Sequence, residues 1–374
     1  MVELPESNRL PIAPLARVFN NVTNSYKFYW FLAILDTVKA RRGRTIAIDH
    51  LLANMIANAW YPLHYFHLSL GKQDQLGQVA DLLRAQSSFL DVNARPQEIA
   101  EAVNDTLTGA GPLTREIRDL GNYVPQRFLR TFFLAQTRGI DDWKVNDLVE
   151  TLAEQYFDDS QSPCLYRFVS TPARSIEIHP VWYEYLQEHI RILEGFCLWH
   201  LVNYLQKRNP NVPNIAGKLF RPEQRDLKQA REYWKLVFES VGQVQCIYSH
   251  QPVSPDNYSL DHFLPWSFVA HDLLWNIIPT PRAVNSSKGD FLPDIERYFE
   301  PFARLQYESV QIVASSRHTR LLEDHLLLLK RVSIQQLQET TFEYFRQVLY
   351  DTIVPQAQIA RNMGFQGDWR YLTE

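Results

Sequence analysis

The chain has 374 residues and a formal net charge of -4 at pH 7, with 45% hydrophobic and 21% charged residues. This composition is typical of a globular protein with a sizeable core. It excludes a strongly basic chain that coats nucleic acid through its overall charge. Any anionic partner therefore needs a local patch of positive side chains.

The start of the chain and its cysteines indicate a cellular compartment. The opening stretch, MVELPESNRLPIAPL, lacks the basic segment and apolar run of a signal peptide, and the run FYWFLAIL is too short to cross a bilayer. The three cysteines, Cys164, Cys197 and Cys246, are far apart and form no CxxC pair, which argues against a disulfide framework. We expect a soluble, cytoplasmic protein without a membrane partner.

The first part of the chain has helical periodicity. It predicts helices over residues 25–43, 45–71, 73–86 and 95–107, with the second broken near Pro62. Residues 108–125 are rich in Gly, Thr and Pro and are expected to form a loop. The alternating runs CLYRFV and SIEIHP then predict a small β-hairpin within residues 164–179.

The remaining elements surround a segment of different character. Helices are predicted over residues 181–208, 221–240, 294–316, 320–331 and 334–356. Residues 241–293 instead contain short β-type runs and turn residues. We therefore predict a mainly α, multi-helical protein with three regions: a helical N-terminal region (1–240), a small β-containing module (241–293) and a C-terminal helical region (294–374).

Adjacent Asp-His pairs occur three times, at Asp49-His50, Asp261-His262 and Asp324-His325. Asp49 is placed to cap a helix, and His325 falls on the charged side of an amphipathic helix. Polar residues follow the middle pair at the spacing DH-x13-N-x8-N-x2-K, and they are Asn276, Asn285 and Lys288. This pattern indicates that the middle pair, unlike the other two, belongs to a site that carries out chemistry.

The pattern resembles the signature of HNH endonucleases, which have the ββα-metal fold, and it is similar to the HNH domains of CRISPR effector nucleases. The resemblance covers roughly residues 244–293 and includes Leu260 and Pro265 as flanks. Bacterial HNH proteins with large helical extensions are similar, and many of them are linked to phage defence. The resemblance implies a ββα-metal module embedded in helices, and an anti-phage effector or nuclease subunit that works with a partner defence protein or by self-association.

Phosphodiester hydrolysis explains the residue types. Asp261 and Asn285 supply oxygens for Mg²⁺ or Mn²⁺, and His262 suits a general base. Asn276 is expected to hold the loop between the strands by hydrogen bonds, and Lys288 to approach a phosphate. Because successive strand residues face opposite ways, we expect a twist or bulge at the Asp-His pair.

Many family members brace the module with a zinc ion held by two CxxC pairs. Here the first pair is reduced to Cys246 and Ser249, and the second falls on Pro281 and Val284. We therefore expect no structural zinc and a small, buried, apolar role for Cys246. His250 and His271 are read as loop histidines, with a second metal ligand or a phosphate contact as the alternative.

A basic helix face precedes the module. The expected contacts to nucleic acid are Arg225, Lys228, Arg231 and Lys235, joined by Arg282. A solvated face with interspersed acidic residues explains this helix equally well. The sequence lacks an evident base-reading element, so we expect duplex DNA to be cleaved with little sequence specificity. The alternatives are an RNA-cleaving HNH nuclease and a non-catalytic helical scaffold that uses the ββα motif for binding.

Overall fold

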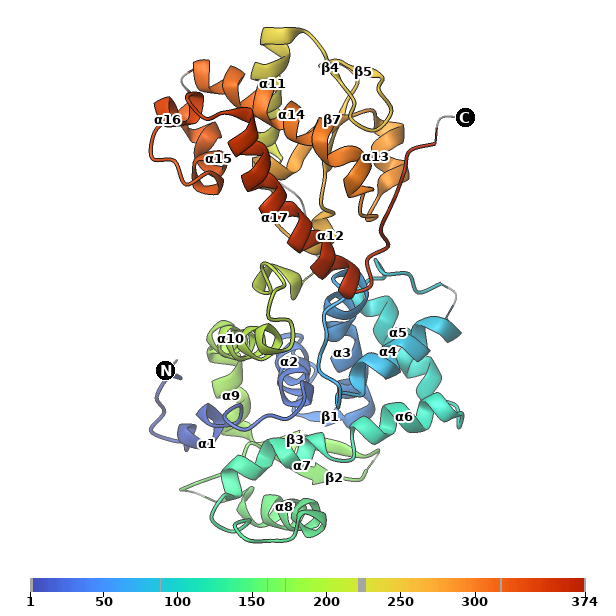
Figure 1. The fold of residues 1–374 in the computed structure, drawn as a ribbon. Helices are drawn as coiled ribbons and strands as arrows, with labels where there is room; N and C mark the ends of the chain where they lie inside the picture. Colours follow the sequence, from blue (N-terminus) through green and yellow to red (C-terminus); the bar gives the residue numbers. More distant parts are fainter. Residues whose placement is uncertain are drawn as a thin grey trace. The chain divides into compact units, whose positions relative to one another are not determined.

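A computed structural model describes residues 3–87, 89–159, 161–171, 173–220, 227–316 and 318–372. The chain divides into two compact units, Met1–Pro210 and Asn211–Glu374. Both are built mainly from helices, so the predicted mainly α class is confirmed (Figure 1). Among the described residues, every helix is too short or too polar to cross a membrane.

The first unit contains ten α-helices within its described residues. They are α1 (Ile12–Ala16), α2 (Tyr26–Lys39), α3 (Ile48–Trp60), α4 (Leu76–Gln86), α5 (Pro96–Leu107), α6 (Pro112–Leu120), α7 (Val124–Leu129), α8 (Asp142–Tyr156), α9 (Pro180–Glu188) and α10 (Ile190–Arg208). Helices α2 and α3 form the centre of its core, because most of their side chains are buried. A buried chain of hydrogen bonds links Trp30 on α2 to the Tyr166 hydroxyl and that hydroxyl to the Pro125 carbonyl on α7.

A three-stranded antiparallel sheet completes this unit, with strand order β1-β3-β2. The predicted hairpin is present as β2 (Tyr166–Val169) and β3 (Ser175–Ile178). The third strand, β1 (Thr45–Ala47), lies where we expected the start of a helix. Its residues pair with β3, so a partner more than a hundred residues away determines their conformation.

Two further predictions for this unit were wrong. The expected loop at 108–125 contains α6, whose apolar residues Leu113, Ile117 and Leu120 recur at helical spacing and are buried. The single helix expected over 181–208 divides into α9 and α10 at His189, which leaves helical geometry with φ of -107° and ψ of 18°. The His189 ring packs on Tyr185, with the two ring centroids 4.7 Å apart.

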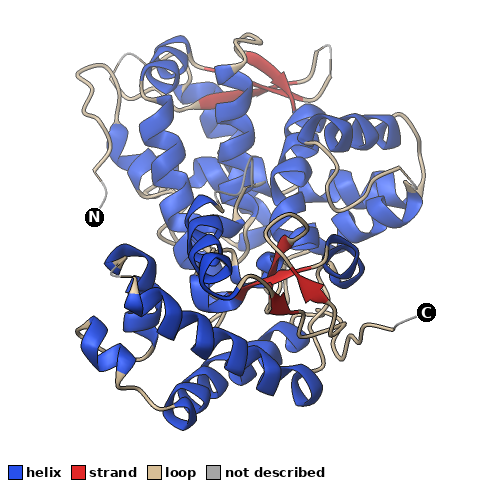
Figure 2. Cartoon of the chain, turned by 90° about the horizontal axis from the view of Figure 1, so that it is seen from above, coloured by secondary structure: helices blue, strands red, loops and turns tan. Residues whose placement is uncertain are grey.

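The second unit contains the β-type segment and the helices around it. The helices are α11 (Lys228–Val241), α12 (Trp266–Val269), α13 (Arg282–Lys288), α14 (Ile295–Ser315), α15 (Glu323–Leu328), α16 (Ile334–Gln338) and α17 (Phe342–Asn362), and the strands are β4 (Val244–Gln245), β5 (Pro252–Val253), β6 (Ser259–His262) and β7 (Ile277–Thr280). The strands, red in Figure 2, form two antiparallel pairs, β4-β5 and β6-β7. With α13 following β7, the order β6-β7-α13 is a ββα element.

This division differs from the three expected regions, because residues 211–240 belong to the second unit. Helix α11 packs its apolar face into the core of the β-containing module. The Trp234 indole on α11 donates to the Ile277 carbonyl on β7 at 3.2 Å, and Gln306 on α14 donates to the same carbonyl at 2.9 Å. Two helices that lie outside the ββα element therefore stabilise the position of β7.

The two other Asp-His pairs have structural roles that differ from those expected. Helix α3 begins at Ile48 with Ala47 as its N-cap, so Asp49 lies in the first turn. His325 is fully buried rather than on a charged face, and its ring stacks on Tyr233 with centroids 5.7 Å apart. Asp324 accepts a hydrogen bond from the backbone N–H of Leu274 at 2.8 Å. This last pair therefore packs beneath the loop that leads into β7.

Burial of His325 generates a pH-dependent stability. Desolvation lowers the pKa of its imidazole from 6.5 to about 3. Between these two pKa values the His325 imidazole is protonated in the unfolded chain and neutral in the folded chain. The free energy of unfolding therefore rises with pH. We predict that wild type loses up to about 1.4 kcal/mol per pH unit on acidification below pH 6.5 from this group alone.

Urea unfolding of wild type and His325→Gln at pH 4, 5, 6 and 7 isolates this contribution, because all other titrating groups are shared. The difference between the two free energies of unfolding should change steadily below pH 6.5. Parallel pH profiles for the two proteins would show that His325 takes up its proton without penalty.

Candidate active site

Strands β6 and β7 place the middle Asp-His pair at the end of a short antiparallel ladder. Asp261 is opposite Ile278 and His262 is opposite Ile277, in an unbroken register of four pairs that starts at Ser259. The expected bulge at this pair is therefore absent from the ladder. The side chains of Asp261 and His262 leave opposite faces of β6, and a third residue connects the Asp261 carboxylate to the His262 backbone.

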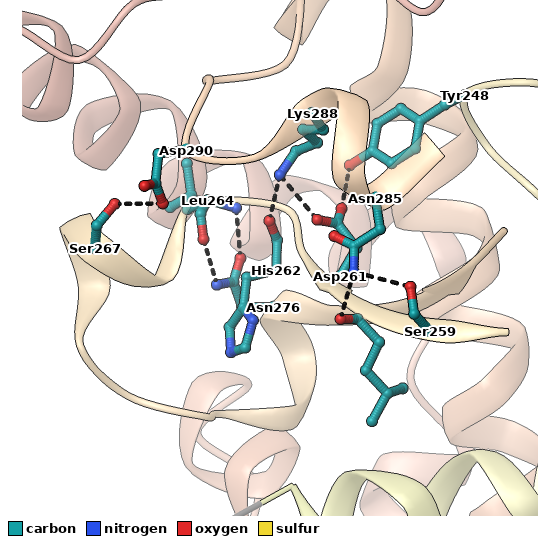
Figure 3. A network of polar contacts seen from close by, with 11 residues as sticks. Tyr248, Ser259, Asp261, His262, Leu264, Ser267, Asn276, Asn285, Lys288 and Asp290 are labelled. Carbon is teal, nitrogen blue, oxygen red and sulfur yellow. Dashed lines mark hydrogen bonds and ion pairs between the residues drawn. The ribbon is translucent and has the colours of Figure 1, made fainter. Parts of the chain in front are cut away.

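That connecting residue is Lys288, at the last position of α13 (Figure 3). Its ammonium donates to Asp261 Oδ1 at 3.0 Å and to the backbone carbonyl of His262 at 2.6 Å. Lys288 is 0% exposed. We expected Lys288 to approach a phosphate. Its ammonium instead points into the module, where it pairs with the Asp261 carboxylate.

Asp261 is buried and accepts hydrogen bonds at both carboxylate oxygens. Besides Lys288, the Tyr248 hydroxyl donates to Oδ2 at 2.8 Å. Burial, and after it the nearby Asp261 carboxylate, raises the pKa of Tyr248 well above its ordinary value, so this hydroxyl keeps its proton. Tyr248 lies thirteen residues before Asp261, and no spacing pattern in the sequence marks it as part of the site.

His262 is buried, and its ring is held by Asp272. The Nε2 atom lies 2.8 Å from Asp272 Oδ1. Because an ionised carboxylate only accepts hydrogen bonds, this contact favours the neutral tautomer with its proton on Nε2 and its lone pair on Nδ1. This arrangement leaves Nδ1 as the basic atom. Asp272 was also missed from the sequence, although it lies between His262 and Asn276 in the loop that must return to the strand.

Asn276 is fully buried and binds both backbone groups of one loop residue. Its Oδ1 accepts from the Leu264 N–H at 2.9 Å, and its Nδ2 donates to the Leu264 carbonyl at 3.0 Å. The Asn276 backbone carbonyl also accepts from the N–H of Phe263 at 2.8 Å. These three bonds join the residues just after His262 to the start of β7, which is the geometry needed to hold the loop.

Asn285 lies on α13, one turn before Lys288. Its Nδ2 donates to Ser259 Oγ at 2.8 Å and to the Leu260 carbonyl at 3.2 Å. Both acceptors belong to β6, so the amide is fixed with its nitrogen toward the strand. Figure 3 shows Asn285 beside Asp261. An amide oxygen and a carboxylate oxygen are thereby brought together from two elements.

The donor set suits a hard divalent cation. Mg²⁺ prefers oxygen ligands and is commonly held by few protein groups plus water and substrate oxygens. An ionised carboxylate has about four lone-pair positions, so the two bonds to Asp261 leave some of its lone pairs unused. Within the described ranges, His, Cys, Asp and Glu form no cluster of three or more that would hold a metal by themselves. Asp261 and Asn285 would supply two oxygens to such an ion, and water and substrate oxygens would supply the rest.

The remaining residues singled out from the sequence lie around this centre. Cys246 is fully buried and free, in the hydrophobic core of the second unit, as expected for a small apolar residue. His250 is exposed, whereas His271 is half-buried, and burial lowers its pKa to about 4. Arg282 is exposed at the first position of α13.

The expected basic face is only partly described. Arg225 lies outside the described residues, while Lys228, Arg231 and Lys235 are on the exposed side of α11. Lys235 pairs with Glu239 at 3.6 Å. Burial raises the pKa of Tyr258, and the positive charge of Arg231 opposes this increase.

Comparison with known proteins assigns this element to a class. Residues 246–293 match the HNH endonuclease family model, and these residues contain Asp261, His262, Asn276, Asn285 and Lys288. The chain thus carries an HNH endonuclease module embedded in a helical protein. No curated protein and no solved structure matches the chain.

The Asp272 contact makes a testable prediction about the His262 ring. In wild type, nitrogen-15 NMR of the imidazoles should show His262 protonated at Nε2, and His262→Gln identifies its signals. Asp272→Ala removes the acceptor, so a mixture of the two neutral tautomers is expected. Asp290→Ala is the matched control, because Asp290 accepts from Ser267 and not from His262. An unchanged tautomer in Asp272→Ala would contradict the assigned role.

Proposed function

We propose that this protein is a metal-dependent endonuclease that hydrolyses phosphodiester bonds in DNA, with Mg²⁺ or Mn²⁺ held by Asp261 and Asn285. The observation that supports the proposal is a histidine ring oriented by Asp272 on a ββα element that matches the HNH endonuclease family model and also carries Asp261 and Asn285. His262 Nδ1 is the free basic atom, and Asp272 holds the opposite side of the ring at 2.8 Å. A binding element has no use for an oriented base.

The reaction uses the residues of the chain as follows. His262 Nδ1 takes a proton from the attacking water as its oxygen forms a bond to phosphorus. The Nε2–H bond to Asp272 stabilises the positive charge that the ring acquires. The P–O bond to the leaving group breaks, and solvent supplies its proton. The divalent ion, when bound, neutralises charge on the phosphate and on the leaving oxygen.

Lys288 and Asn276 act through other residues. The Lys288 ammonium pairs with the buried Asp261 carboxylate and holds α13 against β6. Asn276 fixes the loop that follows His262, so that the ring and the metal ligands keep their relative positions. Both are positioning residues in this mechanism.

The substrate and the biological role extend the proposal. The side chains of Lys228, Arg231, Lys235 and Arg282 are exposed, and in this proposal they contact the phosphate backbone of duplex DNA without base recognition. The three free cysteines agree with action in the reducing cytoplasm. The resemblance to HNH proteins with helical extensions supports a role in phage defence, with a partner defence protein or a second copy of the chain.

Cleavage of supercoiled plasmid tests the activity. We predict nicking in Mg²⁺ or Mn²⁺ and none in EDTA, with linear duplex, single-stranded DNA and RNA assayed in parallel to define the substrate. His262→Ala should lower the rate by about 10²-fold or more. His250→Ala, an exposed histidine of the same module, is the control and should cleave normally. Wild-type rates for His262→Ala, with the melting temperature unchanged, would refute the mechanism.

A further inference from the structure

The first unit contains a large cavity that the nuclease mechanism does not use. Its volume is about 970 Å³. Three segments line it: the chain from α1 into α2, helix α7 with the 3₁₀ turn after it, and the turn that leads to α8. All of these belong to residues 1–210, so the cavity lies within one compact unit.

Positive side chains converge on this cavity. They come from separate parts of the sequence and are Arg17, Lys27, Arg127, Arg130 and Arg138. The one acidic residue in the lining is Asp142, and Arg127 already binds its carboxylate with contacts of 2.5 and 3.0 Å. Five cations against one carboxylate leave an excess of four positive charges, although the chain as a whole carries a net charge of -4.

Most of these charges lack acidic partners. Within the part of the chain that the structure describes, the ion pairs do not include Arg17, Lys27, Arg130 or Arg138. Arg130 is half-buried, so its charge is partly removed from water without a compensating anion. Such an arrangement costs free energy in the absence of a ligand and is typical of sites that bind anions.

Lys27 shows the cost of this crowding. It is half-buried, and its ammonium is 3.4 Å from the carbonyl oxygens of Val18 and Asn21. Burial, followed by repulsion from Arg130 and Arg127, lowers the pKa of Lys27 to about 8. A bound anion would relieve that repulsion.

The rest of the lining suits more than an isolated phosphate. Amide and hydroxyl side chains come from Asn20, Asn21, Asn24, Thr23 and Thr131. The Tyr123 side chain is 62% exposed, which leaves its ring available to stack on a planar group. The volume falls in the range of about 300–1,000 Å³ typical of small-molecule sites.

We propose that this cavity binds a phosphorylated small molecule of nucleotide size, whose phosphates lie among Arg17, Lys27 and Arg130 and whose planar group stacks on Tyr123. A nucleic-acid backbone shares the phosphate chemistry. It favours a charged groove along which successive phosphates can track, whereas here five cations line a single cavity of one compact unit. The site uses residues of the first unit alone, so it stands independently of the nuclease mechanism.

Isothermal titration of the full chain in EDTA tests the proposal, with ATP, GTP, pyrophosphate, adenosine and a twelve-nucleotide single strand as separate probes. The triphosphates should bind, pyrophosphate should bind more weakly, and adenosine should not bind. Arg130→Gln and Arg17→Gln should each weaken ATP binding at least tenfold. Arg115→Gln, which removes an exposed arginine of the same unit outside the cavity, should bind ATP normally.

Three results would overturn the proposal. One is the absence of binding by every phosphate probe. Another is equal loss of affinity in Arg115→Gln, which would reveal a general charge effect. The third is tight binding of the single strand, sensitive to Arg130→Gln, without binding of the triphosphates, which would make the cavity part of a nucleic-acid path. The melting temperatures of Arg17→Gln and Arg130→Gln separate loss of binding from loss of fold. Arg17 is exposed, so its replacement should leave the melting temperature unchanged.

Discussion

The nuclease module depends on the contacts that the buried ammonium of Lys288 makes. The ammonium donates hydrogen bonds to the Asp261 carboxylate and to the His262 backbone carbonyl, and it thereby joins the end of α13 to β6. Lys288 is 0% exposed. Removing one partner of a buried ion pair costs about 3–5 kcal/mol, because the other charge is left uncompensated. The surrounding helices also contact the module: side chains of α11 and α14 both donate hydrogen bonds to the Ile277 carbonyl on β7. These two helices thereby hold β7 from outside the ββα element.

The helical class and the position of the β-containing module followed from periodicity, because long amphipathic helices carry a strong local signal. Strand β1 did not, since Thr45–Ala47 pair with Ser175–Glu177 and no local pattern reports so distant a partner. His325 was misplaced for a related reason. The helix around it is short and apolar on more than one side, so periodicity alone cannot tell which face packs on Tyr233.

For the site, the spacing and the resemblance to HNH endonucleases singled out Asp261, His262, Asn276, Asn285 and Lys288, and the family match spans all five. This was possible because a ββα element is a local structure whose geometry is set by loop lengths. Spacing could not define the contacts of Lys288, which depend on the depth at which α13 packs against β6. Asp272 and Tyr248 reach the site through the path of irregular loops. The cavity of the first unit was invisible in sequence, because its cations come from positions between 17 and 138.

The most direct test of the account is chemical rescue of the base. His262→Gly removes the imidazole but leaves the Lys288 contact with the backbone carbonyl at that position. In single-turnover cleavage of an end-labelled DNA duplex with Mg²⁺, this variant should be nearly inactive. Added imidazole should restore the rate in proportion to its concentration, while His262→Gln, which fills the space, should not respond. A variant that cleaves without imidazole, or that binds DNA and metal yet cannot be rescued, would contradict the role of His262 as the general base.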